Sequence, residues 1–361
     1  MFAIILAGGG GTRLRPLTYA RRKELVPVVN RPLLEYRLLN LRQHGVADVV
    51  IACSQGMREV EDHFGDGTPL GVRIRYSYED RPLGSGRAVK EAAREHEASG
   101  TLVVCNGDII TNVDLTAMVA RHRATGATLS MSLAPVHDPW TYGVAEVDDD
   151  LRIRSFVEKP PQGQEPSNLI NAGTWLWEPQ MLDRIADDDT AVRDGFSERV
   201  LFPGVIADGL RVQGFTEDLW VDVGSPERYL LATRLLLERM TRDAGAEVIG
   251  REEAQVADGV EFEGMVALGR GARVGPGARI IGPSVIGHDA IVGASTVIKG
   301  SALWEEARTG EGARITGSIV GAFAGIGDRA VVTDAVLANG AEVPEDRVLE
   351  PGARLMPNER A

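Results

Sequence analysis

The last third of the chain carries an apolar residue at every sixth position. The repeat runs through Leu268, Val274, Ile280, Ile286, Val292, Ile298 and Trp304. A small or hydroxyl-bearing residue precedes most of these positions by two, as Ala272 and Ser284 do. A six-residue period predicts short parallel strands on the flat faces of a β-helix, where each apolar side chain stacks on its counterpart one coil away.

The phase of this repeat changes after Trp304. Apolar residues return with the same spacing at Val320, Ile326 and Val332. We therefore expect a loop or an irregular coil between Trp304 and Ile319. The pattern resembles the hexapeptide repeat of left-handed parallel β-helices, which predicts such a domain over residues 244–361, preceded by a long amphipathic helix at 226–241. The flat faces of this β-helix favour assembly into a homo-oligomer.

The residues before the repeat alternate between strand-like and helical patterns. Apolar, strand-like runs occur at residues 2–6, 48–53, 72–76, 101–105 and 128–133. Helical patterns lie between them at residues 32–44, 57–64, 84–95 and 113–124. This alternation predicts an α/β domain over residues 1–243, with a Rossmann-like, mixed but mostly parallel sheet and helices on both faces. Ligands of such sheets bind beyond the carboxyl ends of the strands.

A glycine run follows the first of these strands. Gly8, Gly9, Gly10 and Gly11 leave the backbone uncovered, so that its N–H groups can approach a polyphosphate closely. Positive side chains follow within a short distance, at Arg13, Arg15, Arg21, Arg22 and Lys23. Because the whole chain has a net charge of -13, this local concentration of positive charge indicates a small anionic ligand.

Two familiar phosphate-binding motifs do not fit this run. A dinucleotide-binding fingerprint needs a glycine at position 14, which is Leu14. A Walker loop needs lysine and then serine or threonine after the last glycine, whereas Thr12 and Arg13 follow Gly11. The run resembles the signature of the sugar-1-phosphate nucleotidyltransferases, the NDP-sugar pyrophosphorylases. It departs from many members at Glu24, where they carry proline or glutamine.

The resemblance implies roles for the residues of the run. The nucleotide would contact a continuous stretch made of Leu6, Ala7, Gly8, Gly9, Gly10, Gly11 and Thr12. Arg13 would hold the departing phosphates through its planar guanidinium, and Lys23 would lie closer to the α-phosphate. Arg15 is either a phosphate contact or a structural support, and we expect Arg21 and Arg22 to be solvated.

Composition and cysteine content fit a cytoplasmic enzyme. The 361 residues leave room for two domains, and 43% hydrophobic and 25% charged residues are ordinary for a globular protein. Residues 2–6 are too short for a signal-peptide core, and no apolar run is long enough for a membrane span. Cys53 and Cys105 are isolated, so we expect reduced, buried thiols. The acidic balance argues against a nucleic-acid partner.

Two isolated acids lie far apart in the sequence. Asp108 follows an apolar strand, and Asp222 stands before a Gly-Ser-Pro turn. Mg²⁺ favours one or two carboxylates together with phosphate oxygens and water. By resemblance to the family, Asp108 and Asp222 are the metal-binding aspartates, and Mg²⁺ is the expected cofactor.

Three further segments resemble those that line the sugar-phosphate pocket of the family. Gly143 would let backbone meet the sugar ring, Glu158 would accept hydrogen bonds from sugar hydroxyls, and Lys159 would hold the incoming phosphate. Asn171 opens a third segment, Asn-Ala-Gly. Without the resemblance, the Glu158 and Lys159 pair would be an ordinary exposed ion pair.

The segment at residues 78–86 corresponds to the base-reading loop of the family. Gly84 would let the base pack on backbone, and Glu79 stands where pyrimidine-using members tend to carry glutamine. Guanine presents N1–H and its 2-amino group side by side, and one carboxylate can accept hydrogen bonds from both. Glu79 therefore favours GTP, and residues 82–86 resemble the mannose-1-phosphate guanylyltransferases. In contrast, residues 23–27 look more like uridylyl- and thymidylyl-transferring members.

The resemblance implies a direct reaction between two small-molecule substrates. An oxygen of a sugar 1-phosphate would displace pyrophosphate from the α-phosphorus of a nucleoside triphosphate, with positioning and charge stabilisation carrying the catalysis. GTP with mannose 1-phosphate is the expected pair, and glucose 1-phosphate with dTTP or UTP is the alternative. Two further hypotheses are a regulatory NDP-sugar-binding subunit and a hexapeptide-repeat acyltransferase with His288 as its base, although we expect His288 to face solvent.

Overall fold

The computed structural model describes residues 1–54, 57–188 and 195–361. The chain forms two compact units. The first contains Met1–Gly9 and Leu34–Trp220, and the second contains Gly10–Leu33 and Val221–Ala361. The glycine run thus begins in the first unit and ends in the second. The domain boundary expected between residues 243 and 244 stays a prediction.

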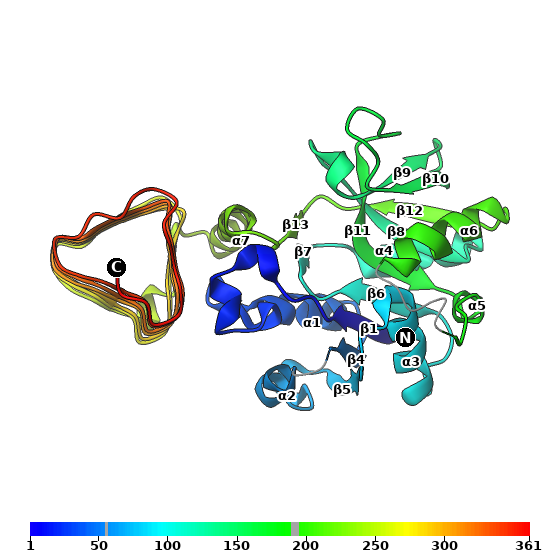
Figure 1. The fold of residues 1–361 in the computed structure, drawn as a ribbon, viewed down its shortest axis with the longest axis horizontal. Helices are drawn as coiled ribbons and strands as arrows, with labels where there is room; N and C mark the ends of the chain where they lie inside the picture. The colour runs from blue at the N-terminus through cyan, green and yellow to red at the C-terminus, as the bar shows by residue number, and fades with distance from the viewer. Residues whose placement is uncertain (55–56, 189–194) are drawn as a thin grey trace. The chain divides into compact units, whose positions relative to one another are not determined.

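The first unit is built on one mixed sheet (Figure 1). Its main strand order is β10-β9-β11-β6-β1-β4-β5, and β8 pairs with β11 and β12. The strands are β1 (Phe2–Ala7), β4 (Asp48–Cys53), β5 (Arg73–Tyr78), β6 (Leu102–Asn106), β8 (Leu129–Pro135), β9 (Gly143–Val147), β10 (Ile153–Glu158), β11 (Leu169–Trp177) and β12 (Val212–Thr216). Strands β6, β1, β4 and β5 are parallel, and β11 runs antiparallel to β6. The predicted α/β sheet is confirmed.

Helices connect these strands; the first four lie where the sequence predicts them, and the last two were not predicted. They are α1 (Leu33–Gln43), α2 (Arg58–Phe64), α3 (Gly84–Glu95), α4 (Leu115–Thr125), α5 (Gln180–Asp183) and α6 (Phe202–Ala207). Helix α4 begins after Asp114, whose carboxylate accepts a hydrogen bond from the Ala117 N–H, and ends at left-handed Gly126. Buried apolar residues such as Val104 and Trp175 form the core of this unit. Cys53 and Cys105 are buried free thiols, as expected.

The second unit contains the expected left-handed parallel β-helix, whose coils are drawn as a triangle in Figure 1. The first sheet holds β14 (Val248–Ile249), β17 (Val266–Leu268), β20 (Ser284–Ile286), β23 (Ala302–Leu303), β26 (Ile319–Val320), β29 (Val336–Leu337) and β31 (Arg354–Leu355). The second holds β15 (Gln255–Val256), β18 (Arg273–Val274), β21 (Ile291–Val292), β24 (Arg308–Thr309), β27 (Gly325–Ile326) and β30 (Glu342–Val343). The third holds β16 (Glu261–Glu263), β19 (Arg279–Ile281), β22 (Val297–Lys299), β25 (Arg314–Thr316) and β28 (Val331–Thr333).

The repeat changes phase because the coils become shorter, and the expected irregular coil is wrong. Val266 pairs with Ser284, eighteen residues on, whereas Val285 pairs with Ala302, seventeen residues on. The missing residue lies between Ile298 and Trp304, so Leu303 enters the core of the β-helix in place of Trp304. Within residues 304–319 the chain instead forms the regular strands β24 and β25 of the β-helix.

The remaining elements of the second unit lie before the β-helix. Gly10–Leu33, here called the glycine-rich loop, contains three short 3-10 helices (Thr12–Leu14, Leu17–Tyr19 and Lys23–Leu25) and the hairpin of β2 (Pro27–Val28) and β3 (Arg31–Pro32). Helix α7 (Pro226–Ala244) begins after the N-cap Ser225 and ends at left-handed Gly245. Among the described residues, no helix combines the length and apolarity needed to cross a membrane.

Candidate active site

The glycine run continues directly from the carboxyl end of β1, which contains Leu6 and Ala7. Gly8 and Gly9 follow in the first unit, and Gly10, Gly11 and Thr12 open the glycine-rich loop. Gly11 has a positive φ of 57°, and a Cβ atom there would lie 2.9 Å from the Thr18 methyl carbon. The Thr18 hydroxyl donates a hydrogen bond to the Gly11 carbonyl at 2.8 Å. A glycine at position 11 is thus what allows the loop to turn tightly here.

Two cations of the loop converge on one carboxylate. The Lys23 Nζ lies 3.6 Å from Asp222 Oδ1, and the Arg13 Nη2 lies 3.4 Å from Asp222 Oδ2. Lys23 is buried, whereas 71% of the Arg13 side chain is exposed. The group therefore presents an exposed planar cation beside a buried compact one, an arrangement suited to a polyphosphate.

Asp108 lies in the turn between β6 and β7 (Ile109–Thr111). The Gly107 N–H donates to the Leu6 carbonyl at 2.9 Å, so this turn lies beside the carboxyl end of β1, where the glycine run begins. No group of three or more His, Cys, Asp and Glu side chains able to hold a metal occurs in the described parts of the chain. The pairing of Asp108 with Asp222 around Mg²⁺ stays a prediction.

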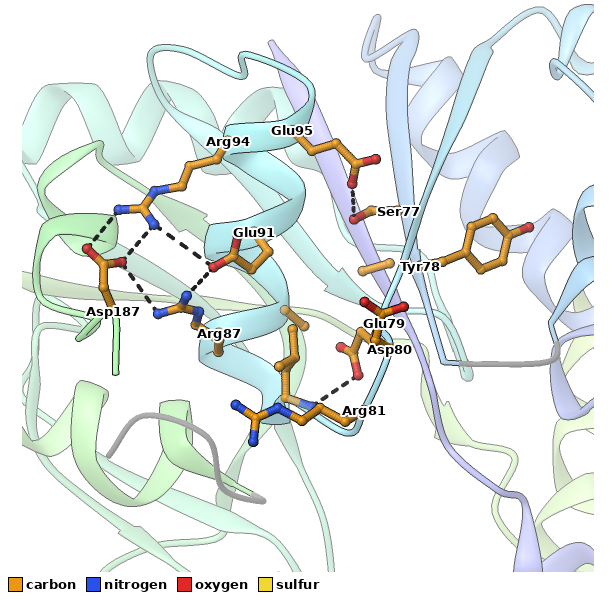
Figure 2. Close-up of a pocket in the computed structure, with 13 residues that line it drawn as sticks. Ser77, Tyr78, Glu79, Asp80, Arg81, Arg87, Glu91, Arg94, Glu95 and Asp187 are labelled. Atoms are coloured by element: carbon orange, nitrogen blue, oxygen red, sulfur yellow. Dashed lines mark hydrogen bonds and ion pairs between the residues drawn. The ribbon is translucent and has the colours of Figure 1, made fainter. Parts of the chain in front are cut away.

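A cavity of about 690 Å³ lies between the end of β5 and helix α3 (Figure 2). Glu79 and Leu83 line it, together with Ser77, Asp80 and Arg81. This volume falls within the range of small-molecule pockets. The base-reading segment predicted from sequence is therefore one wall of a cavity.

Glu79 is half-buried in this wall, and its carboxylate is partly engaged. Its Oε2 accepts a hydrogen bond from the Leu83 N–H at 3.1 Å. Burial raises the pKa of Glu79, and this hydrogen bond opposes the rise. Gly84 does not line the cavity; it has a φ of 76° and is the first residue of α3.

The opposite wall consists of one face of α3, which the sequence analysis missed. Arg87, Glu91 and Arg94 line the cavity, and Asp187 approaches them from the segment after α5. The Asp187 carboxylate lies 2.7 Å from Arg94 Nη1 and 2.8 Å from the Lys90 Nζ, and the pKa of Asp187 falls below its usual range because of these cations. The spacing of Arg87, Glu91 and Arg94 by four and three residues is the signal that could have identified this face.

The residues predicted for the sugar side come together on neighbouring strands. Gly143 of β9 pairs with Glu158 of β10, and the Lys159 Nζ lies 3.8 Å from Glu158 Oε1. A Cβ atom on Gly143 would lie 2.6 Å from Glu158 Oε2 and 2.4 Å from the Phe156 ring. Only glycine therefore leaves the Glu158 carboxylate in this position.

Asn171 lies on the next strand, β11, beside the Ile170 and Val144 pair that joins β11 to β9. Its Oδ1 accepts hydrogen bonds from the Trp175 indole N–H at 3.0 Å and from the Gly173 N–H at 3.1 Å. These two contacts fix the orientation of the amide. The structure thus brings Asn171 close to the strand that carries Gly143.

Two expectations about solvated residues are wrong. Arg21 is an ion-pair partner of Glu305 in the β-helix, with only 21% of its side chain exposed. His288 accepts a hydrogen bond from the Arg270 N–H through Nδ1 at 2.9 Å, and its Nε2 lies 3.2 Å from the Asn30 carbonyl. Both depend on contacts between segments far apart in the sequence, which no local pattern reveals.

Family comparisons cover most of the chain. Residues 2–239 match the family described as nucleotidyl transferase. Residues 249–360 match the family described as the GMPPB C-terminal domain. The two matches together take in the sheet unit, the glycine-rich loop and the β-helix.

Individual relatives are similar over most of their length. A UTP–glucose-1-phosphate uridylyltransferase of Synechocystis is 34% identical, over 89% of this chain and 87% of the relative. A mannose-1-phosphate guanylyltransferase of Mycobacterium tuberculosis is 33% identical, over 78% of each chain. A solved structure assigned to a glucose-1-phosphate thymidylyltransferase of Bacillus anthracis shares the fold, with a TM-score of 0.59 and 24% identity, over 65% of this chain and 94% of that chain.

Proposed function

Since this chain belongs to the nucleotidyl transferase family, we propose that it transfers the guanylyl group of GTP to mannose 1-phosphate. The products would be GDP-mannose and pyrophosphate. The observation that carries the choice of GTP is Glu79, a half-buried carboxylate on the wall of the cavity. A carboxylate accepts hydrogen bonds from both N1–H and the 2-amino group of guanine. The guanylyltransferase of Mycobacterium tuberculosis supports this choice.

A second candidate is uridylyl or thymidylyl transfer to glucose 1-phosphate. The Synechocystis relative, a UTP–glucose-1-phosphate uridylyltransferase, supports this alternative. In addition, the Leu83 N–H already occupies one lone pair of the Glu79 carboxylate. Guanine would then have to share that oxygen or displace the Leu83 contact.

The chemistry would be a direct displacement at the α-phosphorus. A phosphate oxygen of the sugar phosphate attacks, and pyrophosphate leaves with the electron pair of the broken P–O bond. Arg13, whose side chain is largely exposed, would bind the departing phosphates. Buried Lys23 would stabilise negative charge at the α-phosphate. Asp222 holds both cations in place before the substrate binds.

Mg²⁺ fits the donor chemistry of the predicted ligands. Asp108 and Asp222 would supply carboxylate oxygens, which together with phosphate oxygens and water are the ligands that Mg²⁺ prefers. When bound, the ion would neutralise phosphate charge that otherwise opposes the attack.

The sugar phosphate would bind at the end of strands β9 and β10. Glu158 would accept hydrogen bonds from sugar hydroxyls beside the uncovered backbone of Gly143, and Lys159 would pair with the phosphate. Asn171, whose amide oxygen is held within its own strand, would present its amide nitrogen to the sugar. The proposal also includes a cytoplasmic homo-oligomer that assembles through the β-helix and binds neither nucleic acid nor membrane.

The decisive experiment measures pyrophosphate release with Mg²⁺ for each pairing of GTP, UTP, dTTP or ATP with mannose 1-phosphate or glucose 1-phosphate. The proposal expects the highest kcat/KM with GTP and mannose 1-phosphate. The highest value with a pyrimidine nucleotide and glucose 1-phosphate would support the second candidate instead. No release with any pair would contradict both.

Glu79→Gln tests the base assignment directly. The amide can accept at only one oxygen and keeps the size of the side chain, so kcat/KM for GTP should fall about tenfold or more, the cost of about one charge-assisted hydrogen bond. The values for UTP and dTTP should fall less. Asp80→Asn on the same wall is the matched control. Equal losses for all three nucleotides would remove Glu79 from base recognition.

A further inference from the structure

The glycine-rich loop packs against the β-helix within the second unit. The Arg354 Nη1 donates to the Arg15 carbonyl at 3.1 Å. The Asn30 Nδ2 donates to the Ile286 carbonyl at 3.0 Å. Two ends of the loop are therefore attached to two different coils, one on each side of Lys23 in the sequence.

A third contact lies close to Lys23 itself. Arg21, two residues before Lys23, forms an ion pair with Glu305. The Arg21 guanidinium also lies over the Trp304 ring, 5.3 Å from its centre. Both side chains of the ion pair are mostly buried, with 21% and 27% of their surfaces exposed. Pairs of this kind contribute more than fully exposed ones, because solvent screens them less.

A hydrogen-bond chain holds the loop on the other side of Lys23. The Trp304 indole N–H donates to the Tyr229 hydroxyl at 2.9 Å. That hydroxyl donates to the Pro27 carbonyl at 2.7 Å. Burial raises the pKa of Tyr229, so the hydroxyl keeps the proton that it donates. Trp304 thus contacts Arg21 directly and Pro27 through one side chain of α7.

The shortened coil makes these contacts possible. If the next core position followed Ile298 by six residues, Trp304 would enter the core of the β-helix. It follows Ile298 by five residues, so Leu303 takes that place. Trp304 is still buried, with 2% exposed, but against Tyr229 rather than in the core of the β-helix. Shortening this coil by one residue therefore places Trp304 where it can contact Tyr229.

We propose that Trp304 and Glu305 of the β-helix are positioning residues for nucleotidyl transfer, because they hold Arg21 and Pro27 on either side of Lys23. The inference rests on the proposed roles of Lys23 and Arg13 in the reaction. The β-helix then does more than assemble oligomers: it sets the geometry of the loop that binds the phosphates. Neither Trp304 nor Glu305 needs to touch the substrate for this role.

The test uses the full-length protein and three variants: Glu305→Gln, Trp304→Phe, and the reversed pair Arg21→Glu with Glu305→Arg. Glu305→Gln keeps the shape and removes the charge, and Trp304→Phe keeps a ring and removes the N–H. Each single substitution should lower kcat about tenfold or more, since a displacement of about 1 Å can cost up to 10²-fold. KM for the sugar phosphate should change less than about threefold, because its proposed site is on other strands. The reversed pair should recover much of the loss of Glu305→Gln.

Hydrogen exchange supplies a readout that does not depend on activity. The Leu25 and Val26 amides donate to the carbonyls of Arg22 and Lys23 within the loop. Their exchange should accelerate in Glu305→Gln and Trp304→Phe, because the loop opens more often. Asp346→Asn is the matched control: it breaks the ion pair with Arg329 at another coil of the same β-helix. It should change neither loop exchange nor kcat.

Accelerated exchange together with a lower kcat, and recovery in the reversed pair, would support the inference. Unchanged exchange, unchanged kcat, or an equal loss of kcat in Asp346→Asn would overturn it. All values are measured with whichever substrate pair the wild-type protein turns over fastest. Inactivity with GTP and mannose 1-phosphate would therefore contradict the proposed substrates without deciding this inference.

Discussion

Lys23 is a buried cation that lies beside the Asp222 carboxylate. It is 6% exposed and lies 3.6 Å from Asp222 Oδ1, so it cannot move far without losing that partner. A buried ammonium is costly unless paired, which explains why the loop retains it beside Asp222. When a phosphate binds, such a fixed charge needs little reorganisation.

Lys23→Met should lower kcat by about 10²–10³-fold, the usual effect of removing one preorganised charge from a transition state. The methionine keeps the length of the side chain but removes one of the cations beside the Asp222 carboxylate, so the melting temperature should fall as well. Steady-state pyrophosphate release measures the effect, with exposed Lys299→Met in the β-helix as the control. A kcat within a few-fold of the wild-type value would exclude Lys23 from the chemical step.

Glu217 is a second buried ionisable residue, and no proposed step uses it. Its pKa rises to about 8 because burial outweighs the stabilising effect of Arg37. The Thr111 hydroxyl donates a hydrogen bond to its Oε2. Since the folded pKa lies above the ordinary value of 4.5, the stability that Glu217 contributes at low pH is lost as pH rises from about 4.5 to about 8.

Glu217→Gln should remove this loss, because the amide stays neutral at every pH. Its melting temperature should match that of the wild type near pH 4.5 and exceed it by several degrees at pH 8.5, since each pKa unit corresponds to about 1.4 kcal/mol. Thermal unfolding across that pH range measures the difference. Exposed Glu59→Gln on α2 is the control. A constant difference between Glu217→Gln and the wild type would mean that Glu217 is ionised in the folded protein throughout.

At the scale of elements, strands β9 and β10 fix the proposed sugar site through their register. Gly143 faces Glu158 across the pair, and Phe156 lies beside it. The strand ends were predicted to carry a sugar-binding glycine and carboxylate. The pairing explains why these two residues, fifteen positions apart in the sequence, lie together.

Gly143→Ala should displace the Glu158 carboxylate and the Phe156 ring, because the new Cβ would lie 2.6 Å and 2.4 Å from them. We expect KM for the sugar phosphate to rise about tenfold or more, as when one charge-assisted hydrogen bond is lost, while KM for the nucleotide stays nearly constant. Gly204→Ala in α6 is the control, since its Cβ would meet no atom within 4 Å. Equal changes in both KM values would contradict the assignment.

The β-helix shows how much of an element can be predicted from its period. The spacing of six identified the strands and the core positions up to Ile298, because each flat face needs the same number of residues. It failed at Trp304, because coils of seventeen residues place a five-residue interval at one corner. Leu303 and Trp304 are both large and apolar, so hydrophobicity could not distinguish between them.

At the scale of the whole molecule, the two compact units have separate hydrophobic cores. The first surrounds the sheet, and the second fills the β-helix. A hydrogen-bond ladder runs through the second core: the Ser318 N–H donates to the Ser301 hydroxyl at 3.0 Å, and the Ala335 N–H donates to the Ser318 hydroxyl at 3.1 Å. Ser318 is fully buried.

Calorimetry should therefore resolve two unfolding transitions. Ser318→Ala leaves the Ala335 N–H unpaired. It should lower the free energy of unfolding of the β-helix unit by about 1–3 kcal/mol and leave that of the sheet unit unchanged. Glu217→Gln at pH 8.5 should raise only the melting temperature of the first unit, which contains the sheet. A single transition that responds to both substitutions would show that the two units unfold together.

Some parts of the candidate site are predictable from the sequence, and other parts are not. The glycine run, Asp222 and the Glu158 and Lys159 pair belong to short motifs, whose chemistry depends on neighbouring residues in the chain. The α3 wall of the cavity and its contact with Asp187 were missed. Arg94 and Asp187 come together only when α3 and the segment after α5 fold against the same space.

The sequence by itself determined the α/β fold, the β-helix and the identity of the glycine-rich loop, because periodicity and local backbone requirements are written in consecutive residues. Only the tertiary structure decided that Arg21 is paired rather than solvated, that His288 is engaged, and that Trp304 lies outside the core of the β-helix. Arg21 and Glu305 are 284 positions apart. Contacts over such separations depend on how coils and loops pack, which no local pattern specifies.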